Sequence, residues 1–108
     1  TFIMVKMMRE MMEIISRQIP IPEARTYPKE RLIADLKQLA NRLVTEEPIS
    51  GRQDEFLYKF VRENYHDEYQ IISDLSRHIE KEYNCRMTEE EIIYLVLNIR
   101  RMRDLYTC

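Results

Sequence analysis

The scarcity of residues that interrupt regular structure constrains the fold of this chain more than any other feature. Its 108 residues contain only one glycine and four prolines. A β-sandwich or barrel turns every few residues and needs many such positions. Where apolar residues instead recur every three or four positions, an amphipathic helix is the expected structure. The sequence therefore predicts an all-α protein.

Five segments have this helical spacing. Pro20 and Pro22 end the first of them, because proline cannot extend a helix. Ile49 to Gly51, which includes the only glycine, is expected to connect the second segment to the third. A chain of this length supports one domain, so residues 1–108 are expected to form a single five-helix bundle with antiparallel helix pairs. The predicted helices cover about residues 2–18, 28–45, 53–64, 68–83 and 88–105.

Three of the predicted helices begin at recognisable capping residues. Thr26 precedes Pro28, and proline is favoured in the first turn of a helix. Thr88 and Glu91 have the spacing of a capping box, in which the two side chains satisfy each other's backbone amides. Asp67 is the candidate cap of the fourth helix, after a turn that includes His66.

The inner stripes of these helices predict the core. In the third helix, Phe56, Leu57, Phe60 and Val61 are expected to face inward. The residues expected to be largely buried are Leu36, Leu39, Phe60, Leu75, Ile79, Leu95 and Ile99.

The first helix is apolar around most of its circumference, which is more than one core can cover. Five of the seven methionines lie in it, and methionine-rich faces usually provide adaptable packing. Excess apolar surface marks contacts with other molecules, so we expect a two-fold symmetric homodimer. The candidate interface residues are Met8, Met12, Tyr94 and Met102.

Composition disfavours several other classes of protein. The formal net charge of −2 provides no field that would attract nucleic acid or an anionic membrane. No apolar run approaches the roughly 20 residues of a membrane-spanning helix. Cys85 and Cys108 do not make a disulfide framework. We therefore expect a cytoplasmic protein with reduced thiols and no direct nucleic-acid or membrane partner.

The motifs of common enzymes are missing from the sequence. It contains no glycine-rich phosphate loop, no nucleophile elbow and no Cys-x-x-Cys pair. His66 and His78 form no recognisable metal-ligand spacing with the cysteines. We expect no enzyme activity, no cofactor and no metal, with His66 exposed or capping and His78 structural.

Two polar residues lie on or beside apolar stripes. Asn98 falls inside the apolar arc of the fifth helix, where a buried amide needs a hydrogen-bond partner on another helix or subunit. Asp35 flanks the stripe of the second helix and shares a face with Arg42, which predicts a carboxylate near an arginine.

Three segments resemble the PTS-regulation domain, or PRD. Thr88 to Arg101 (TEEEIIYLVLNIRR) resembles the closing helix of that family, which leads from an acidic start into a histidine-containing apolar stretch. Leu32 to Arg42 (LIADLKQLANR) resembles its other marked helix, and Tyr65 to Ile72 (YHDEYQII) resembles the stretch before its fourth helix. The resemblance covers about residues 32–102.

The resemblance implies a fold of five helices and a regulatory function. PRDs belong to bacterial antiterminators and activators of sugar operons, in which phosphotransfer onto PRD histidines changes the dimer state. This chain resembles the short, free-standing type of PRD protein, or a fragment of a larger regulator. The implied partners are a second copy, another PRD-containing regulator, or proteins of the sugar phosphotransferase system.

This sequence departs from the family at both histidine positions. They correspond to Asp35 and Asn98, neither of which can form a phosphoimidazole. The resemblance therefore favours a non-enzymatic regulatory and dimerisation module without the usual phosphorylation. If Asp35 and Asn98 occupy the family's regulatory sites, they should lie near each other or near a subunit boundary. The alternative is a phosphoacceptor protein that uses His66 or His78.

Overall fold

The computed structural model describes residues 2–46 and 54–107, with the side chains of these ranges described up to residue 104. The expected connection at Ile49 to Gly51, the predicted start of the third helix at Gln53, and Cys108 lie outside the described residues. Five α-helices follow one another, and the described residues contain no strand. They are α1 (Phe2–Gln18), α2 (Tyr27–Thr45), α3 (Glu55–Asn64), α4 (His66–Tyr83) and α5 (Glu89–Thr107). The predicted all-α fold is confirmed.

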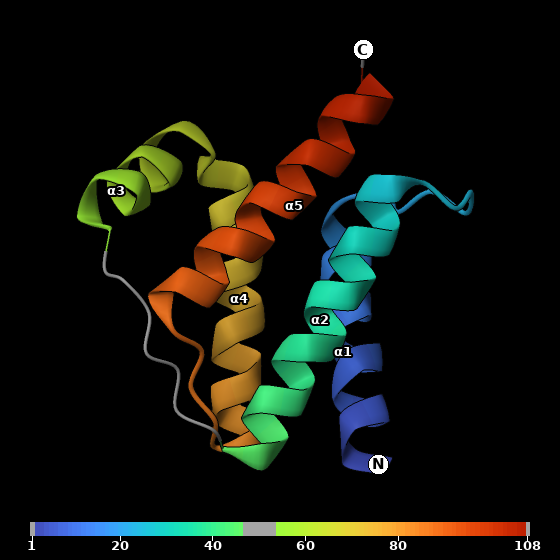
Figure 1. The fold of residues 1–108 in the computed structure, drawn as a ribbon, viewed down its shortest axis with the longest axis vertical. Helices are drawn as coiled ribbons and strands as arrows, with labels where there is room; N and C mark the ends of the chain where they lie inside the picture. Colours follow the sequence, from blue (N-terminus) through green and yellow to red (C-terminus); the bar gives the residue numbers. More distant parts are fainter. Residues whose placement is uncertain (1, 47–53, 108) are drawn as a thin grey trace.

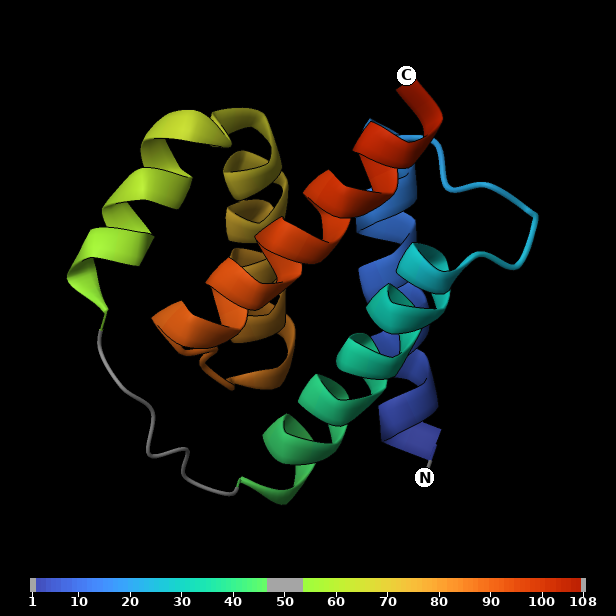
Figure 2. The same ribbon diagram turned by 45° about the horizontal axis from the view of Figure 1, so that its top comes forward.

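The helices pack as antiparallel neighbours around α5. Helices α1 and α2 run side by side in opposite directions, and α4 runs antiparallel to α1 (Figures 1 and 2). Helix α5 crosses the front of the molecule in Figure 1 and contacts α2, α3 and α4. Because α2 and α4 approach it from opposite sides, α5 joins the two halves of the bundle.

Capping residues set several of the helix ends as the sequence predicts. The Thr26 hydroxyl accepts a hydrogen bond from the backbone amide of Lys29 at the start of α2. At the start of α5, the Thr88 amide donates to Glu91 at 2.8 Å, and the Glu91 amide donates to the Thr88 hydroxyl at 3.1 Å. This reciprocal pair is the predicted capping box.

The predicted turn at His66 and the Asp67 cap are wrong. Tyr65 ends α3 by donating its amide to the Val61 carbonyl, and its own carbonyl accepts the first hydrogen bond of α4, from Tyr69. One residue therefore serves as the cap of both helices and leaves no room for a turn. His66 is consequently the first residue of α4, and Asp67 lies inside the first turn rather than before it.

The core contains six of the seven side chains predicted to be buried; Phe60 is the exception. Phe60 is 46% exposed, and Phe56 is 84% exposed. Helix α3 lies at the edge of the molecule and packs only against α4 and α5 among the described helices (Figure 1). Its inward stripe is Tyr58 and Val61. Leu57 is exposed as well, so of the four residues predicted to face inward only Val61 does, and the predicted phase of this helix was wrong. Phe60 instead packs edge-on against the Tyr65 ring, with 6.0 Å between ring centroids.

The first helix buries one stripe and exposes apolar residues near its beginning. Met7, Met11 and Ile15 are buried, whereas Phe2 is 82% and Val5 is 61% exposed. The four candidate interface residues fall into three groups. Met8 and Met12 are half-buried against the core, Tyr94 is 58% exposed, and Met102 is only 1% exposed. Met102 is therefore a core residue and offers no surface to a partner.

A polar cluster joins α1 to α4. The Tyr83 hydroxyl donates to Glu10 Oε2 at 2.6 Å, and His78 Nε2 lies 3.4 Å from the same oxygen. The hydrogen bond from Tyr83 lowers the pKa of Glu10 below its ordinary value. Burial, followed by the hydrogen bond to Glu10, raises the pKa of Tyr83 to about 12. His78 thus has the structural position expected of it, at a helix–helix contact.

A second cluster attaches α5 to α4. Glu68 is buried, and its Oε1 accepts from Arg103 at 2.6 Å and from Arg100 at 3.3 Å. The Arg100 guanidinium also lies over the Tyr65 ring, 5.2 Å from its centroid. Arg100 and Arg103 therefore neutralise one buried carboxylate. The prediction that they suit the helix dipole is wrong, because α5 continues to Thr107 and its last turn contains no basic residue.

Replacing a core side chain should cost far more than replacing the exposed aromatic one. We expect Ile79→Ala to lower the free energy of unfolding by about 2–5 kcal/mol, because transfer energy is lost and a cavity remains. Phe60→Ala should cost less than about 2 kcal/mol, because the ring is already partly solvated. Urea denaturation of both variants measures this difference. Equal losses in the two variants would contradict the phase of α3.

The Tyr83–Glu10 hydrogen bond should make stability depend on alkaline pH. Because the pKa of Tyr83 is higher in the folded state than the ordinary value of about 10, its contribution is complete below that pH. The contribution is then lost as the pH rises through about 12. Tyr83→Phe should be less stable than wild type at neutral pH and should show a smaller further loss at alkaline pH.

Thermal unfolding between neutral and strongly alkaline pH measures this effect. Tyr27→Phe is the matched control, because Tyr27 is 71% exposed. Parallel pH profiles for wild type and Tyr83→Phe would show that the bond does not couple to folding.

Candidate functional site

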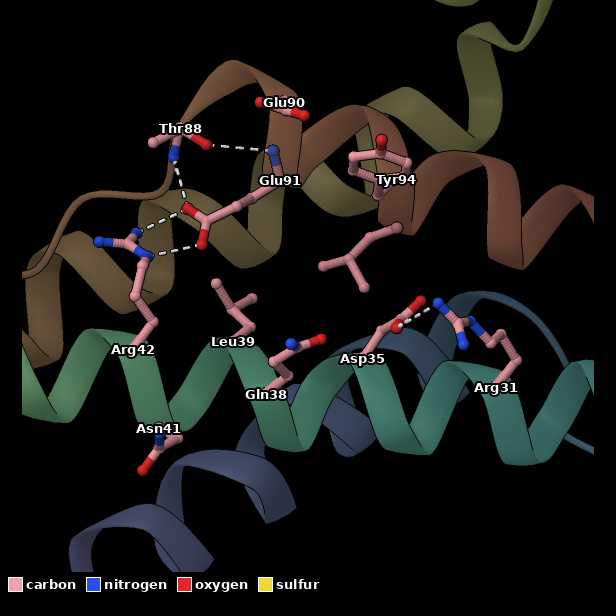
Figure 3. Close-up of a pocket in the computed structure, with 11 residues that line it drawn as sticks. Arg31, Asp35, Gln38, Leu39, Asn41, Arg42, Thr88, Glu90, Glu91 and Tyr94 are labelled. Carbon is pink, nitrogen blue, oxygen red and sulfur yellow. Dashed lines mark hydrogen bonds and ion pairs between the residues drawn. The ribbon is translucent and has the colours of Figure 1, made fainter. Parts of the chain in front are cut away.

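A groove of about 590 Å³ lies between α2 and α5. Leu39 and Leu95 provide its apolar part, and most of its other lining residues are polar. Figure 3 shows Gln38 and Arg31 on the α2 side and Tyr94 on the α5 side. Its arrangement follows from the crossing of α5 over α2, which brings residues about 50 to 60 positions apart in sequence into contact.

Asp35 and Asn98 meet beside this groove. The Asn98 side-chain amide donates a hydrogen bond to Asp35 Oδ2. The side chain of Asp35 is 17% exposed, and Asn98 is 7% exposed. The other carboxylate oxygen of Asp35 lies 3.6 Å from the Arg31 guanidinium. Each oxygen of Asp35 therefore has its own partner, one on α5 and one on its own helix.

This geometry confirms two expectations and corrects one. Asn98 does find its partner on another helix, and Asp35 does lie close to it. Asp35 also lies near an arginine, but that arginine is Arg31, which is one helical turn earlier. Arg42, which was expected to share a face of α2 with Asp35, pairs instead with the carboxylate of Glu91.

Arg42 closes the other end of the groove. Its Nε and Nη2 donate to the two oxygens of Glu91, each at 2.6 Å (Figure 3). Nη2 also donates to the Arg86 carbonyl at 3.0 Å. The side chains of Arg42 and Glu91 are 16% and 13% exposed. A two-pronged ion pair with this little exposure is stronger than a surface pair. Glu91 thus serves both as the capping-box residue of α5 and as its attachment to α2.

Sequence reasoning missed this second function of Glu91. The capping box was visible because its two members are three residues apart, whereas Arg42 lies on a different helix 49 positions away. A lone arginine near the end of a helix is ordinarily explained by the helix dipole, so nothing local pointed to the contact.

The comparisons with known proteins identify the family of the chain. A family model of the PRD domain matches residues 9–102. The chain belongs to the PRD domain family. The match includes most of α1, so it extends beyond the segment from residue 32 that the sequence motifs indicated.

Two relatives of this PRD are transcription antiterminators. The chain is 31% identical over 98 residues to the "Transcription antiterminator LicT" of Bacillus subtilis, covering 90% of this chain. It is 28% identical over 100 residues to the "Beta-glucoside operon antiterminator" of Dickeya chrysanthemi, covering 92% of this chain. In both comparisons the chain spans only 35% of the relative's length.

The two histidines of this PRD lie outside the groove. The side chain of His66 is 69% exposed at the start of α4. His78 faces Glu10 of α1, which is a different contact of the bundle from the one between α2 and α5. The structure therefore brings Asp35 and Asn98 together and leaves both histidines apart from them.

Two further features bear on the chemistry of this PRD. Among the described residues, no group of His, Cys, Asp and Glu side chains is arranged to hold a metal ion. No helix in the same part of the chain is long and apolar enough to cross a membrane. The groove presents carboxylates, guanidinium groups, amides and a phenol, which suit hydrogen bonding and ion pairing.

The two arginines of the groove should differ in their effect on stability. Arg42→Met leaves Glu91 without its partner in a nearly buried position, and we expect a loss of about 2–4 kcal/mol in the free energy of unfolding. Arg31→Met removes a pair whose arginine is 53% exposed, and we expect a loss below about 1 kcal/mol. Urea denaturation of both variants tests the prediction, and a reversed order would refute it.

Proposed function

We propose that this PRD is a non-enzymatic regulatory module of a sugar-operon control system, and that it forms homodimers. The observation that carries the proposal is the hydrogen bond between Asn98 and Asp35 across α2 and α5. From the sequence resemblance we infer that the phosphoaccepting histidines of the family correspond to these two positions. In this chain they hold an amide and a carboxylate instead.

The side chains at these positions give the module a fixed charge. A phosphohistidine would bring a charge approaching −2 to the α2–α5 contact, and would do so only when the phosphotransferase system supplies it. Asp35 instead supplies about −1 at every moment at neutral pH, and Arg31 partly neutralises that charge. A fixed charge biases a conformational equilibrium by a constant amount. The proposed module is therefore set in one state rather than switched.

Family membership supports the regulatory part of the proposal. Both relatives are named as antiterminators, and one of them as the antiterminator of a β-glucoside operon. Because the chain matches only 35% of the length of each, we propose that it corresponds to a regulatory portion of such a protein. We propose as partners a second copy, a PRD-containing regulator, or cytoplasmic proteins of the phosphotransferase system.

The competing function is phosphoacceptance at a different histidine. The exposure of His66 makes it the more accessible candidate. His78 is disfavoured, because a phosphoryl group on it would be repelled by the Glu10 carboxylate 3.4 Å from its Nε2.

Incubation with phosphoenolpyruvate, enzyme I and the phosphocarrier HPr, followed by intact-mass measurement, separates the two functions. We expect no phosphoryl group on the wild-type chain. Asp35→His should become phosphorylated, because it restores an imidazole next to α5. Phosphorylation of wild type that disappears in His66→Gln or His78→Gln would instead establish the competing function.

A further inference from the structure

The outer side of α5 has one stripe of residues that are exposed or only partly buried. Glu90, Tyr94, Leu97 and Arg101 follow one another at spacings of four, three and four residues, so they lie in line along the helix. Tyr94 is 58% exposed, Arg101 is exposed, and Glu90 and Leu97 are half-buried. Figure 3 shows Glu90 and Tyr94 on this helix beside the groove. We call these four residues the α5 stripe.

Glu90 and Arg101, the two charged residues of the α5 stripe, differ from the neighbouring charged residues of α5, which form ion pairs. Glu91 pairs with Arg42, Glu89 with Arg62, and Arg100 with Glu68. Within the described part of the chain, Glu90 and Arg101 take part in no hydrogen bond or ion pair.

The spacing of the α5 stripe is the same when read in either direction. An antiparallel copy of α5 that places its Arg101 opposite Glu90 therefore also places its Leu97 opposite Tyr94. The two-fold symmetry then produces two Glu90–Arg101 pairs and two Tyr94–Leu97 pairs. A surface that complements itself in this way is what a two-fold symmetric dimer requires.

We propose that a second copy of this chain packs its α5 antiparallel on the α5 stripe, with Glu90 of each copy paired with Arg101 of the other. The proposal rests on the proposed function, because it names the surface through which the regulatory module dimerises. Charge complementarity specifies the direction of the two helices. A parallel arrangement would place Glu90 against Glu90 and Arg101 against Arg101, and like charges at an interface are strongly unfavourable.

The proposed pairing places Tyr94 at the centre of the contact and Arg101 at its end. Tyrosine and arginine are among the residue types that most often carry binding energy at protein interfaces. Pairing would cover the exposed Tyr94 ring and place a cation beside the Glu90 carboxylate.

Sedimentation equilibrium of charge-reversed variants tests the proposal. Glu90→Lys and Arg101→Glu should each raise the dimer dissociation constant by about tenfold or more, because both symmetric pairs become repulsive. An equimolar mixture of the two variants should recover association. In that mixed dimer, the basic side chains of one variant face the acidic side chains of the other at both positions. The double variant should likewise dimerise with itself.

Two controls separate this effect from changes in folding or net charge. Glu55→Lys reverses an exposed carboxylate in the first turn of α3, which matches the place of Glu90 in α5. Arg25→Glu reverses an arginine whose side chain is 91% exposed. Both should leave the dissociation constant unchanged, and circular dichroism should show all variants folded.

Three outcomes are distinguishable for the α5 pairing and the homodimer. Loss of association in the single variants with recovery on mixing supports the α5 pairing. A wild-type dimer that is indifferent to these reversals overturns the α5 pairing and leaves the proposed dimeric module standing, with another exposed surface such as Phe56 of α3 as its interface. A wild type that sediments only at 13.3 kDa overturns both the pairing and the homodimer.

Discussion

The pair of hydrogen bonds between Arg42 and Glu91 is the contact on which the arrangement of this protein most depends. It joins the end of α2 to the beginning of α5, and α5 in turn contacts α3 and α4. Because Glu91 also caps its own helix, the same carboxylate determines where α5 begins and where it lies. With that end attached, Asn98 is brought one to two turns further along to the position of Asp35 on α2.

The contact between Asp35 and Asn98 therefore has little freedom. Both groups are mostly buried, and each satisfies the other. We propose that these two positions correspond to the family's phosphoaccepting histidines. On that proposal, a carboxylate and a neutral amide make a constant electrostatic contribution to the α2–α5 contact, as expected of a fixed rather than a switched module.

The charges of α5 show how one helix divides its surface among several contacts. Carboxylates in its first turn pair with arginines from α2 and α3, and arginines near its end share the buried Glu68 of α4. Among the described residues, the α5 charges without an ion-pair partner are Glu90 and Arg101; both lie on the α5 stripe, and Glu90 also lines the groove between α5 and α2. Such a distribution leaves the outer side of α5 with matched opposite charges at its two ends, separated by about three turns of helix.

Much of this protein was determined by local sequence. The helical period, the Thr26 and Thr88 caps and the buried stripes of α2, α4 and α5 were all predictable, because each depends on residues within a few positions of one another. The pairing of Asp35 with Asn98 was accessible only through the family resemblance. The phase of α3 was not predictable, because its apolar residues cover more than one side and the choice of the inward one depends on where α4 and α5 lie. Only the tertiary structure decided that Arg42 pairs with Glu91 rather than lying beside Asp35. The two residues are 49 positions apart in sequence, so their contact depends on how α2 and α5 pack.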